Sequence, residues 1–178
     1  RFTDFVDVGK TDNAVTVADN YHRIYGDLHT ITNSPNKELR KIDEIQGIKT
    51  PDFILGDTLI ESKKMDPSDR PLSNAQTIGD ILHNNIRQLD PNVARIRDVN
   101  GNIIPFPRNH QKIFNIDTST RTWTINRGDL NWHINQVFED YPFLDEVHIN
   151  YFKNDGKRVM RYFRDGDDVV MRILEVGR

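Results

Sequence analysis

The strongest constraint on the fold is an amphipathic helical pattern that begins near Ser73 and ends before Pro91. Apolar residues recur there at spacings of three and four, which is the period of a helix with one buried face. Ser73 and Gln76 fit a capping box, in which each side chain bonds the other residue's free backbone N–H, and Pro91 cannot continue a helix. The expected buried stripe consists of Ala75, Ile78, Leu82, Ile86 and Leu89. The opposite face carries Gln76, Asp80, His83 and Arg87.

Shorter patterns on both sides of this helix predict strands and two further helices. Upstream, we expect a helix over 12–25, a strand at 28–32, a charged and briefly helical segment within 33–47, and strands at 51–55 and 58–63 around a turn at Gly56-Asp57. Downstream, we expect strands at 93–99 and 113–116, a helix at 129–138, and strands at 146–152, 158–163 and 169–176, with hairpin turns at 155–156 and 165–166. This order predicts an α/β or α+β fold with a mixed central sheet and a C-terminal antiparallel β-meander.

The chain has 178 residues, the length of a single domain that can bury a core without a disulfide or a metal. The lack of cysteine excludes a disulfide scaffold, a zinc finger and a thiol nucleophile. The net charge of −3 disfavours a protein that coats DNA but permits a nuclease with a local basic groove. No apolar run approaches the ~20 residues of a membrane span, so we expect none. The first residue is Arg1 and not Met, which indicates a processed product, a fragment or a domain of a longer protein.

One stretch, from Thr50 to Lys64, carries a recognisable chemistry. Pro51-Asp52 begins one predicted strand, and Glu61-Ser62-Lys63 ends the next. Because side chains alternate across a strand, Glu61 and Lys63 point to the same face. The chain can double back across Gly56, which brings Asp52 toward Glu61. We therefore expect two carboxylates and a lysine to converge on one site.

Such a set of side chains suits phosphodiester hydrolysis. Asp52 and Glu61 supply the oxygen ligands that Mg²⁺ or Mn²⁺ prefers, with waters completing the octahedron, and Zn²⁺ is a further candidate. The metal neutralises the phosphate and lowers the pKa of a bound water. A cationic Lys63 beside it orients that water or stabilises the pentavalent phosphorane.

The combination of Pro51-Asp52 with Glu61-Ser62-Lys63 resembles the PD-(D/E)xK nuclease superfamily, which includes restriction endonucleases, Holliday-junction resolvases and many bacterial toxin domains. The superfamily has an αβββαβ core, and the elements expected over residues 12–99 follow that order. The resemblance therefore implies one nuclease domain with its core at 12–99 and a β-rich extension at 100–178. It implies Asp52, Glu61 and Lys63 as catalytic residues, with Asp52 and Glu61 as the metal ligands.

Two further residues follow from the resemblance. The family often has one more acid on the first helix, usually a Glu. Asp19 is the nearest candidate and departs from that pattern, and Glu38 and Glu44 are alternatives. The helix after the motif often carries a polar residue that faces the site, which here would be Gln76, although its capping role explains it as well.

The domain's size, its start without Met and its lack of cysteine resemble the C-terminal toxin domains of polymorphic systems, such as contact-dependent growth inhibition effectors. This resemblance implies part of a larger protein that is secreted or delivered into the cytoplasm of a target cell. It implies a nuclease that cuts tRNA or DNA and is blocked by a cognate immunity protein. Phosphate contacts carry no base information, and the acidic net charge favours a compact substrate such as tRNA slightly over DNA.

A function of a different class stays open from the residues alone. The chain could be a non-catalytic interaction protein, such as an immunity or adaptor protein, with its β-meander as a pairing edge. Asp52, Glu61 and Lys63 would then be ordinary surface charges. The six histidines lack HxH or HExxH spacing, which disfavours a metalloprotease, whereas a metal-independent RNase with a histidine acid and base is an alternative.

Aromatic and basic residues in the second half have two interpretations each. Trp123 and Trp132 are expected in the core, and stacking on a base is the alternative. Four arginines of the late strands either line a groove for a phosphate backbone or pair with aspartates across the strands. These arginines are Arg158, Arg161, Arg164 and Arg172.

Overall fold

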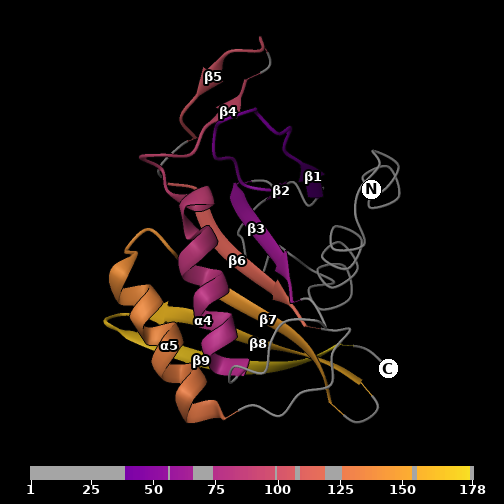
Figure 1. Cartoon of the computed structure of the whole chain (residues 1–178), viewed down its shortest axis with the longest axis vertical. Coiled ribbons are helices and arrows are strands. Elements are labelled where there is room, and N and C mark those ends of the chain that lie inside the picture. Colours follow the sequence, from indigo (N-terminus) through magenta and orange to yellow (C-terminus); the bar gives the residue numbers. More distant parts are fainter. Residues whose placement is uncertain are drawn as a thin grey trace.

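Two helices lie on one face of a mixed sheet (Figure 1) in the computed structural model of this chain, which describes residues 39–55, 57–65, 74–98, 100–106, 109–118, 126–153 and 156–176. The sheet has seven strands in the order β1-β2-β3-β6-β7-β8-β9. The strands are β1 (Leu39–Lys41), β2 (Phe53–Leu55), β3 (Thr58–Lys64), β6 (Gln111–Asp117), β7 (Glu146–Lys153), β8 (Gly156–Asp165) and β9 (Asp168–Val176). The helices are α4 (Asn74–Asn85), which a 3₁₀ helix η1 (Ile86–Leu89) continues, and α5 (Arg127–Asp140).

Strand direction changes in the middle of the sheet. β3 pairs in parallel with β6, and β6 pairs in parallel with β7. All other neighbours in this sheet pair antiparallel. Parallel neighbours need long crossovers, and α4 and α5 lie in the two crossovers that lead from β3 to β6 and from β6 to β7. The described chain therefore has the mixed α+β architecture that the order of the sequence patterns predicts.

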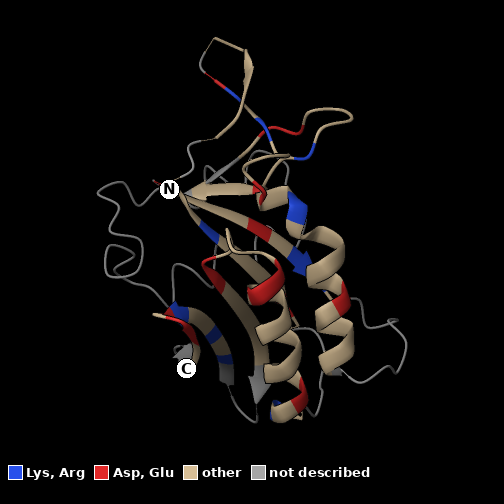
Figure 2. Cartoon of the chain, turned by 90° about the vertical axis from the view of Figure 1, so that its left-hand side faces the viewer, with Lys and Arg blue, Asp and Glu red and all other residues tan. Residues whose placement is uncertain are grey.

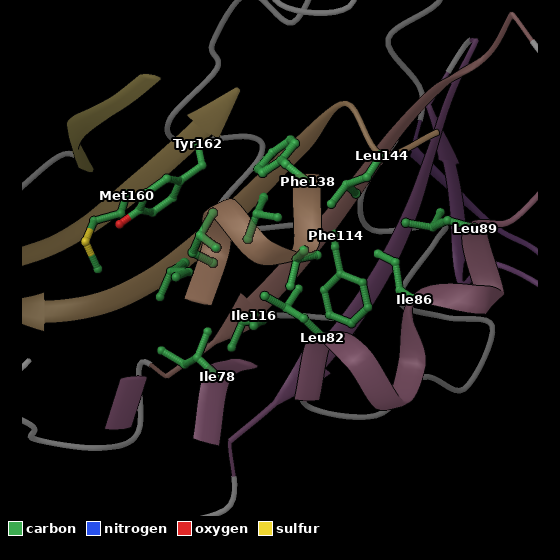
Figure 3. Close-up of a cluster of buried hydrophobic side chains, with 14 of the residues drawn as sticks. Ile78, Leu82, Ile86, Leu89, Phe114, Ile116, Phe138, Leu144, Met160 and Tyr162 are labelled. Atoms are coloured by element: carbon green, nitrogen blue, oxygen red, sulfur yellow. The ribbon is translucent and has the colours of Figure 1, made fainter. Parts of the chain in front are cut away.

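The main core lies between the two helices and the sheet (Figure 3). Every member of the predicted α4 stripe is buried, and so are four apolar residues of α5, namely Leu130, Ile134, Val137 and Phe138. Phe114 and Ile116 of β6 lie beneath both helices. The helices pack closely, since a Cβ added at Gly79 of α4 would lie 2.9 Å from Nδ1 of His133 on α5. A larger residue than glycine at this crossing would require the His133 side chain or the helices to shift.

The other face of the parallel strands is also buried but is largely polar. Ser62 of β3, Asn115 of β6 and His148 of β7 are neighbours in the strand register, and alternation puts all three on the face away from the helices. They are 2%, 1% and 1% exposed. Burial on both faces is typical of parallel strands, but three polar residues in a row are unusual there because each one needs a partner.

Several predicted boundaries are confirmed. The helical pattern from Ser73 corresponds to α4 and η1, which together end before Pro91. The helix expected at 129–138 begins two residues earlier, where Oδ1 of Asn126 caps it by accepting from Asp129 N at 3.1 Å. The late strands form the predicted meander within the central sheet, and Gly166 has the positive φ of 62° that its hairpin turn requires.

The strand predicted at 93–99 is confirmed only in its middle. Only β4 (Ile96–Arg97) forms a ladder there, and it pairs with β5 (Ile103–Ile104) in a separate hairpin that stands off the main sheet (Figure 1). The place beside β3 belongs to β6 instead. Arg95, Arg97 and Asp98 make the earlier segment too polar for a strand buried on both faces, whereas Ile113–Ile116 is completely buried.

Two other expectations are wrong where the structure describes them. The segment expected to be briefly helical contains the strand β1 in its described part, residues 39–47, because Leu39–Lys41 pairs with β2. Trp132 is not in the core, since it is 60% exposed on α5. The helix predicted over 12–25, the strand at 28–32, Ser73 and Trp123 lie outside the described residues.

Candidate active site

Asp52 is fixed at the start of β2 by hydrogen bonds to the chain on both sides. Its carbonyl oxygen accepts from Ile42 N at 2.9 Å, and its own N–H donates to the carbonyl of Ile60 at 3.1 Å. Its side chain also bonds across the hairpin, because Oδ2 accepts from the backbone N–H of Ser62 at 2.9 Å. The carboxylate of Asp52 therefore lies against the motif strand β3, at the residue between Glu61 and Lys63.

Glu61 and Lys63 lie on the face of β3 that the helices cover. Leu59, on the same face, is part of the main core, and the pairing of Phe53 with Ile60 puts Asp52 next to Glu61 in the register. Nζ of Lys63 lies 4.0 Å from Oε2 of Glu61, and the side chains are 40% and 1% exposed. A cation near a buried carboxylate offsets the cost of removing its charge from water. The structure thus places the side chains of Glu61 and Lys63 together on β3 and bonds the carboxylate of Asp52 to the residue between them.

Further contacts hold the segment that leads into Asp52, and sequence reasoning missed them. The backbone N–H of Thr50 donates to Oε1 of Gln88 on η1 at 2.9 Å. The N–H of Arg95 donates to the carbonyl of Lys49 at 2.9 Å. Gln88 lies between two buried apolar residues of the helical stripe, and no local pattern distinguishes it from a surface glutamine. These bonds hold residues 49–50, just before Asp52, against η1 and the segment that follows it.

The structure describes two of the four remaining candidate site residues, Gln76 and Glu44. Gln76 lies in the first turn of α4 with an exposed side chain, and its role stays a prediction. Glu44 is exposed in the segment between β1 and β2. Asp19 and Glu38 lie outside the described residues.

Two carboxylates from adjacent strands form a donor set that fits a hard divalent cation. Their oxygens are the ligands that Mg²⁺ and Mn²⁺ take, and such ions usually keep several waters. In the described part of the chain, no three His, Asp or Glu side chains gather as a metal site. Asp52 and Glu61 would therefore hold the ion as a pair, with water in the other positions.

A second cluster of polar and charged side chains lies on the polar face of the sheet. We call its members the Glu146 cluster, namely Gln111, Glu146, His148 and Arg161. Arg161 donates to both carboxylate oxygens of Glu146, from Nε at 2.6 Å and from Nη2 at 3.0 Å. Nε2 of Gln111 donates at 2.7 Å, and Nε2 of His148 lies 2.8 Å from Oε1. Burial alone would raise the pKa of Glu146, but the hydrogen bonds and charges of His148 and Arg161 lower it to about 2.

The Glu146 cluster accounts for part of the basic pattern in the late strands. Arg161 forms an ion pair with the buried Glu146, and its guanidinium also lies 4.3 Å from the centre of the Phe163 ring. Arg164 is structural as well, because it donates to the carbonyls of Leu144 and Phe138, both at 2.8 Å, at the end of α5. Two of the four arginines therefore have partners within the fold, and a groove for a phosphate backbone built from all four stays a prediction.

Within the described residues, no helix combines the length and the apolar character needed to cross a membrane. Comparisons of the chain with protein-family models, with curated proteins and with solved structures find no match.

Proposed function

We propose that this chain is a metal-dependent endonuclease that hydrolyses phosphodiester bonds at Asp52, Glu61 and Lys63. The observation that carries the proposal is the hydrogen bond from Ser62 N to Oδ2 of Asp52, because it joins the two halves of the motif. A further support is the order β1, β2, β3, α4 and β6, in which η1 and the separate β4–β5 hairpin stand between α4 and β6. That order matches the βββαβ part of the αβββαβ core in the PD-(D/E)xK superfamily, which the motif resembles.

Each of the three side chains has a role in this proposal. Asp52 and Glu61 hold a Mg²⁺ or Mn²⁺ ion, with Zn²⁺ as a further candidate. When bound, the ion supplies charge neutralisation at the phosphate and a water of lowered pKa. Lys63 has one side toward Glu61 and is 40% exposed, so its ammonium can also meet the substrate. There it stabilises the negative charge that develops on the phosphorane.

The distribution of charge bears on how a nucleic acid approaches. Four acidic side chains are exposed on the two helices (Figure 2), namely Asp80, Asp129, Glu139 and Asp140. They disfavour the outer helical surface, including the exposed Trp132, as a binding surface for phosphates. The substrate therefore reaches the site without lying along the helices. A compact RNA such as tRNA fits this arrangement better than a long duplex, with DNA as the second candidate.

The biological setting belongs to the same proposal. A nuclease of this kind harms the cell that makes it, so we infer a toxin domain of a larger protein that is delivered into a target cell. A cognate immunity protein would block it in the producing cell. Expression of the active chain alone should slow growth, and expression of a variant without Glu61 should not.

Cleavage assays decide between this proposal and a non-catalytic interaction protein. The purified chain is incubated with tRNA and, separately, with plasmid DNA, in the presence of Mg²⁺, Mn²⁺ or Zn²⁺. Cleavage that EDTA abolishes, and that the Glu61→Gln protein prepared in parallel lacks, supports the nuclease. Cleavage of neither substrate with any of the metals, by a protein that is folded by circular dichroism, contradicts it.

Metal binding gives a prediction that does not depend on finding the substrate. We expect the chain to bind Mn²⁺ weakly, in the high-micromolar to millimolar range, because few carboxylates contribute. Asp52→Asn removes a charged ligand while keeping the size of the side chain, so the affinity should fall at least ~10-fold. Isothermal titration calorimetry with Mn²⁺ measures it, and Glu44→Gln, an exposed acid nearby in the sequence, is the control. Equal affinity of Asp52→Asn and the unchanged chain would place the metal elsewhere.

A further inference from the structure

Ser62 connects the candidate site with the polar face of the sheet. Toward β2, in the plane of the sheet, its backbone N–H donates to Asp52. On the polar side, its Oγ lies 3.2 Å from Nδ2 of Asn115, which is directly beside it on β6. Ser62 and Asn115 are 2% and 1% exposed. One residue thus carries both the contact to the carboxylate and a buried hydrogen bond to the next strand.

The orientation of the Asn115 amide is itself determined by a third strand. Nδ2 of Asn150 on β7 donates to Oδ1 of Asn115 at 2.5 Å and lies 3.4 Å from the carbonyl of Ile116. Because Oδ1 of Asn115 receives this donor, its Nδ2 is left to face Ser62. The three residues form a chain of side-chain hydrogen bonds across β3, β6 and β7.

We propose that Asn115 is a positioning residue of the site, which fixes Ser62 and through its backbone N–H fixes the carboxylate of Asp52. The proposal rests on the nuclease function proposed above. Asn115 is on the opposite face of the sheet and touches neither metal nor substrate. Hydrogen bonds between buried side chains on neighbouring strands hold those strands in one arrangement. Restriction of Ser62 from the polar side keeps its N–H directed at Asp52, so the metal ligands keep their spacing.

The burial of Asn115 supports a positioning role, because a buried amide needs a reason to be there. Ile60 and Ile113 on the same face are completely buried, so an apolar side chain at residue 115 would meet apolar neighbours as well as polar ones. Buried polar groups contribute little net stability, yet they are costly once a partner is lost. A packing role alone would not need the amide, whereas orientation of Ser62 does.

The test measures Mn²⁺ affinity, which a merely structural role would leave unchanged in a folded protein. Loss of a group that orients a metal ligand typically lowers metal affinity by 10- to 100-fold, and we expect a fall of at least ~10-fold in Asn115→Ala. Ser62→Ala deletes the same hydrogen bond from the other side and should give a similar fall. Since both changes remove one interaction, the double variant should be little weaker than either single variant.

Tyr162→Phe is the matched control. It also removes one hydrogen bond of a buried residue, from the Tyr162 hydroxyl to Oδ1 of Asn131 at 2.7 Å, but on the helix side. We expect its Mn²⁺ affinity to stay within about twofold of the unchanged chain. Should Asn115→Ala fail to fold, Ser62→Ala carries the test alone, because it removes only one oxygen.

The amide resonance of Ser62 in ¹H–¹⁵N spectra provides a readout that needs no metal. In Asn115→Ala it should shift toward the position of an amide without a carboxylate acceptor, while Tyr162→Phe leaves it in place. If the unchanged chain binds Mn²⁺ and the affinities and the Ser62 resonance are the same in all variants, the positioning role is wrong and the nuclease proposal stands. If the unchanged chain neither binds Mn²⁺ nor cleaves, the proposed function fails, and the positioning role fails with it.

Discussion

Replacement of Glu61 by glutamine or of Lys63 by alanine should lower nucleic-acid cleavage at least ~10²-fold without unfolding the chain. In the proposed mechanism, Glu61→Gln removes a negative metal ligand at nearly constant volume, and Lys63→Ala removes the cation that stabilises the phosphorane. The loss of one such electrostatic group typically costs 10²- to 10³-fold in rate. Initial rates with tRNA and plasmid at saturating Mg²⁺ measure the effect, and circular dichroism verifies the fold.

Lys64, the next residue on β3, provides the control for Lys63→Ala because it is also a lysine. Alternation along β3 turns its side chain to the opposite face from Lys63, so Lys64→Ala changes the net charge equally without touching the site. Its cleavage rate should stay within about tenfold of the unchanged chain. Equal losses in Lys63→Ala and Lys64→Ala would indicate general attraction of the substrate and would remove the catalytic role from Lys63.

The second large effect concerns stability and the Glu146 cluster. Glu146 is 3% exposed and accepts hydrogen bonds from side chains on β6 and β8 as well as its own strand. Glu146→Gln leaves the guanidinium of Arg161 without its buried counter-charge, and breaking a buried pair from one side costs about 3–5 kcal/mol. Urea unfolding should show this loss, and Glu139→Gln, an exposed acid on α5, should change stability by less than about 0.5 kcal/mol.

The same carboxylate predicts how stability depends on pH. Its pKa is about 2 in the folded chain against a usual value of 4.5, so folding favours the ionised form. The stabilisation is complete above pH ~4.5 and is lost as the pH falls toward 2, and the shift corresponds to about 3 kcal/mol. Unfolding free energies measured from pH 6 to pH 2 should therefore fall less steeply in Glu146→Gln than in the unchanged chain. Parallel curves would contradict a lowered pKa at Glu146.

The sequence was sufficient to predict those parts of the fold that local patterns determine. The period of α4 identified its buried face, because apolar residues at helical spacing leave few alternatives. Alternation along β3 and a turn near Gly56 were likewise enough to group Asp52, Glu61 and Lys63. In each case the contacts join residues close in the chain, as in the bond between Asp52 and Ser62, which are 10 residues apart.

Long-range contacts could not be predicted in the same way. Periodicity does not say which strand lies beside which, and only the structure shows that β6 pairs with β3. Gln88 bonds a residue 38 positions away, and Asn115 bonds one 53 positions away. The sequence around Gln88 or Asn115 does not indicate which residue each will bond. The prediction that Trp132 lies in the core failed for another reason. An aromatic residue on a helix has the same local sequence pattern whether it is buried or exposed.

The parallel pairing of β3 with β6 has a consequence for the order of folding. The β2–β3 hairpin closes a short loop and can form within microseconds, so Asp52 and Ser62 can meet early. The bond between Ser62 and Asn115 spans 53 residues. Because α4 and the β4–β5 hairpin lie between them in the chain, this contact closes a long loop and is a slow, high-contact-order step. A chain that emerges from a ribosome or a secretion channel thus forms the motif hairpin before the strand that restrains it. Full metal affinity would then appear only at the last, cooperative stage of folding, when the central strands have joined.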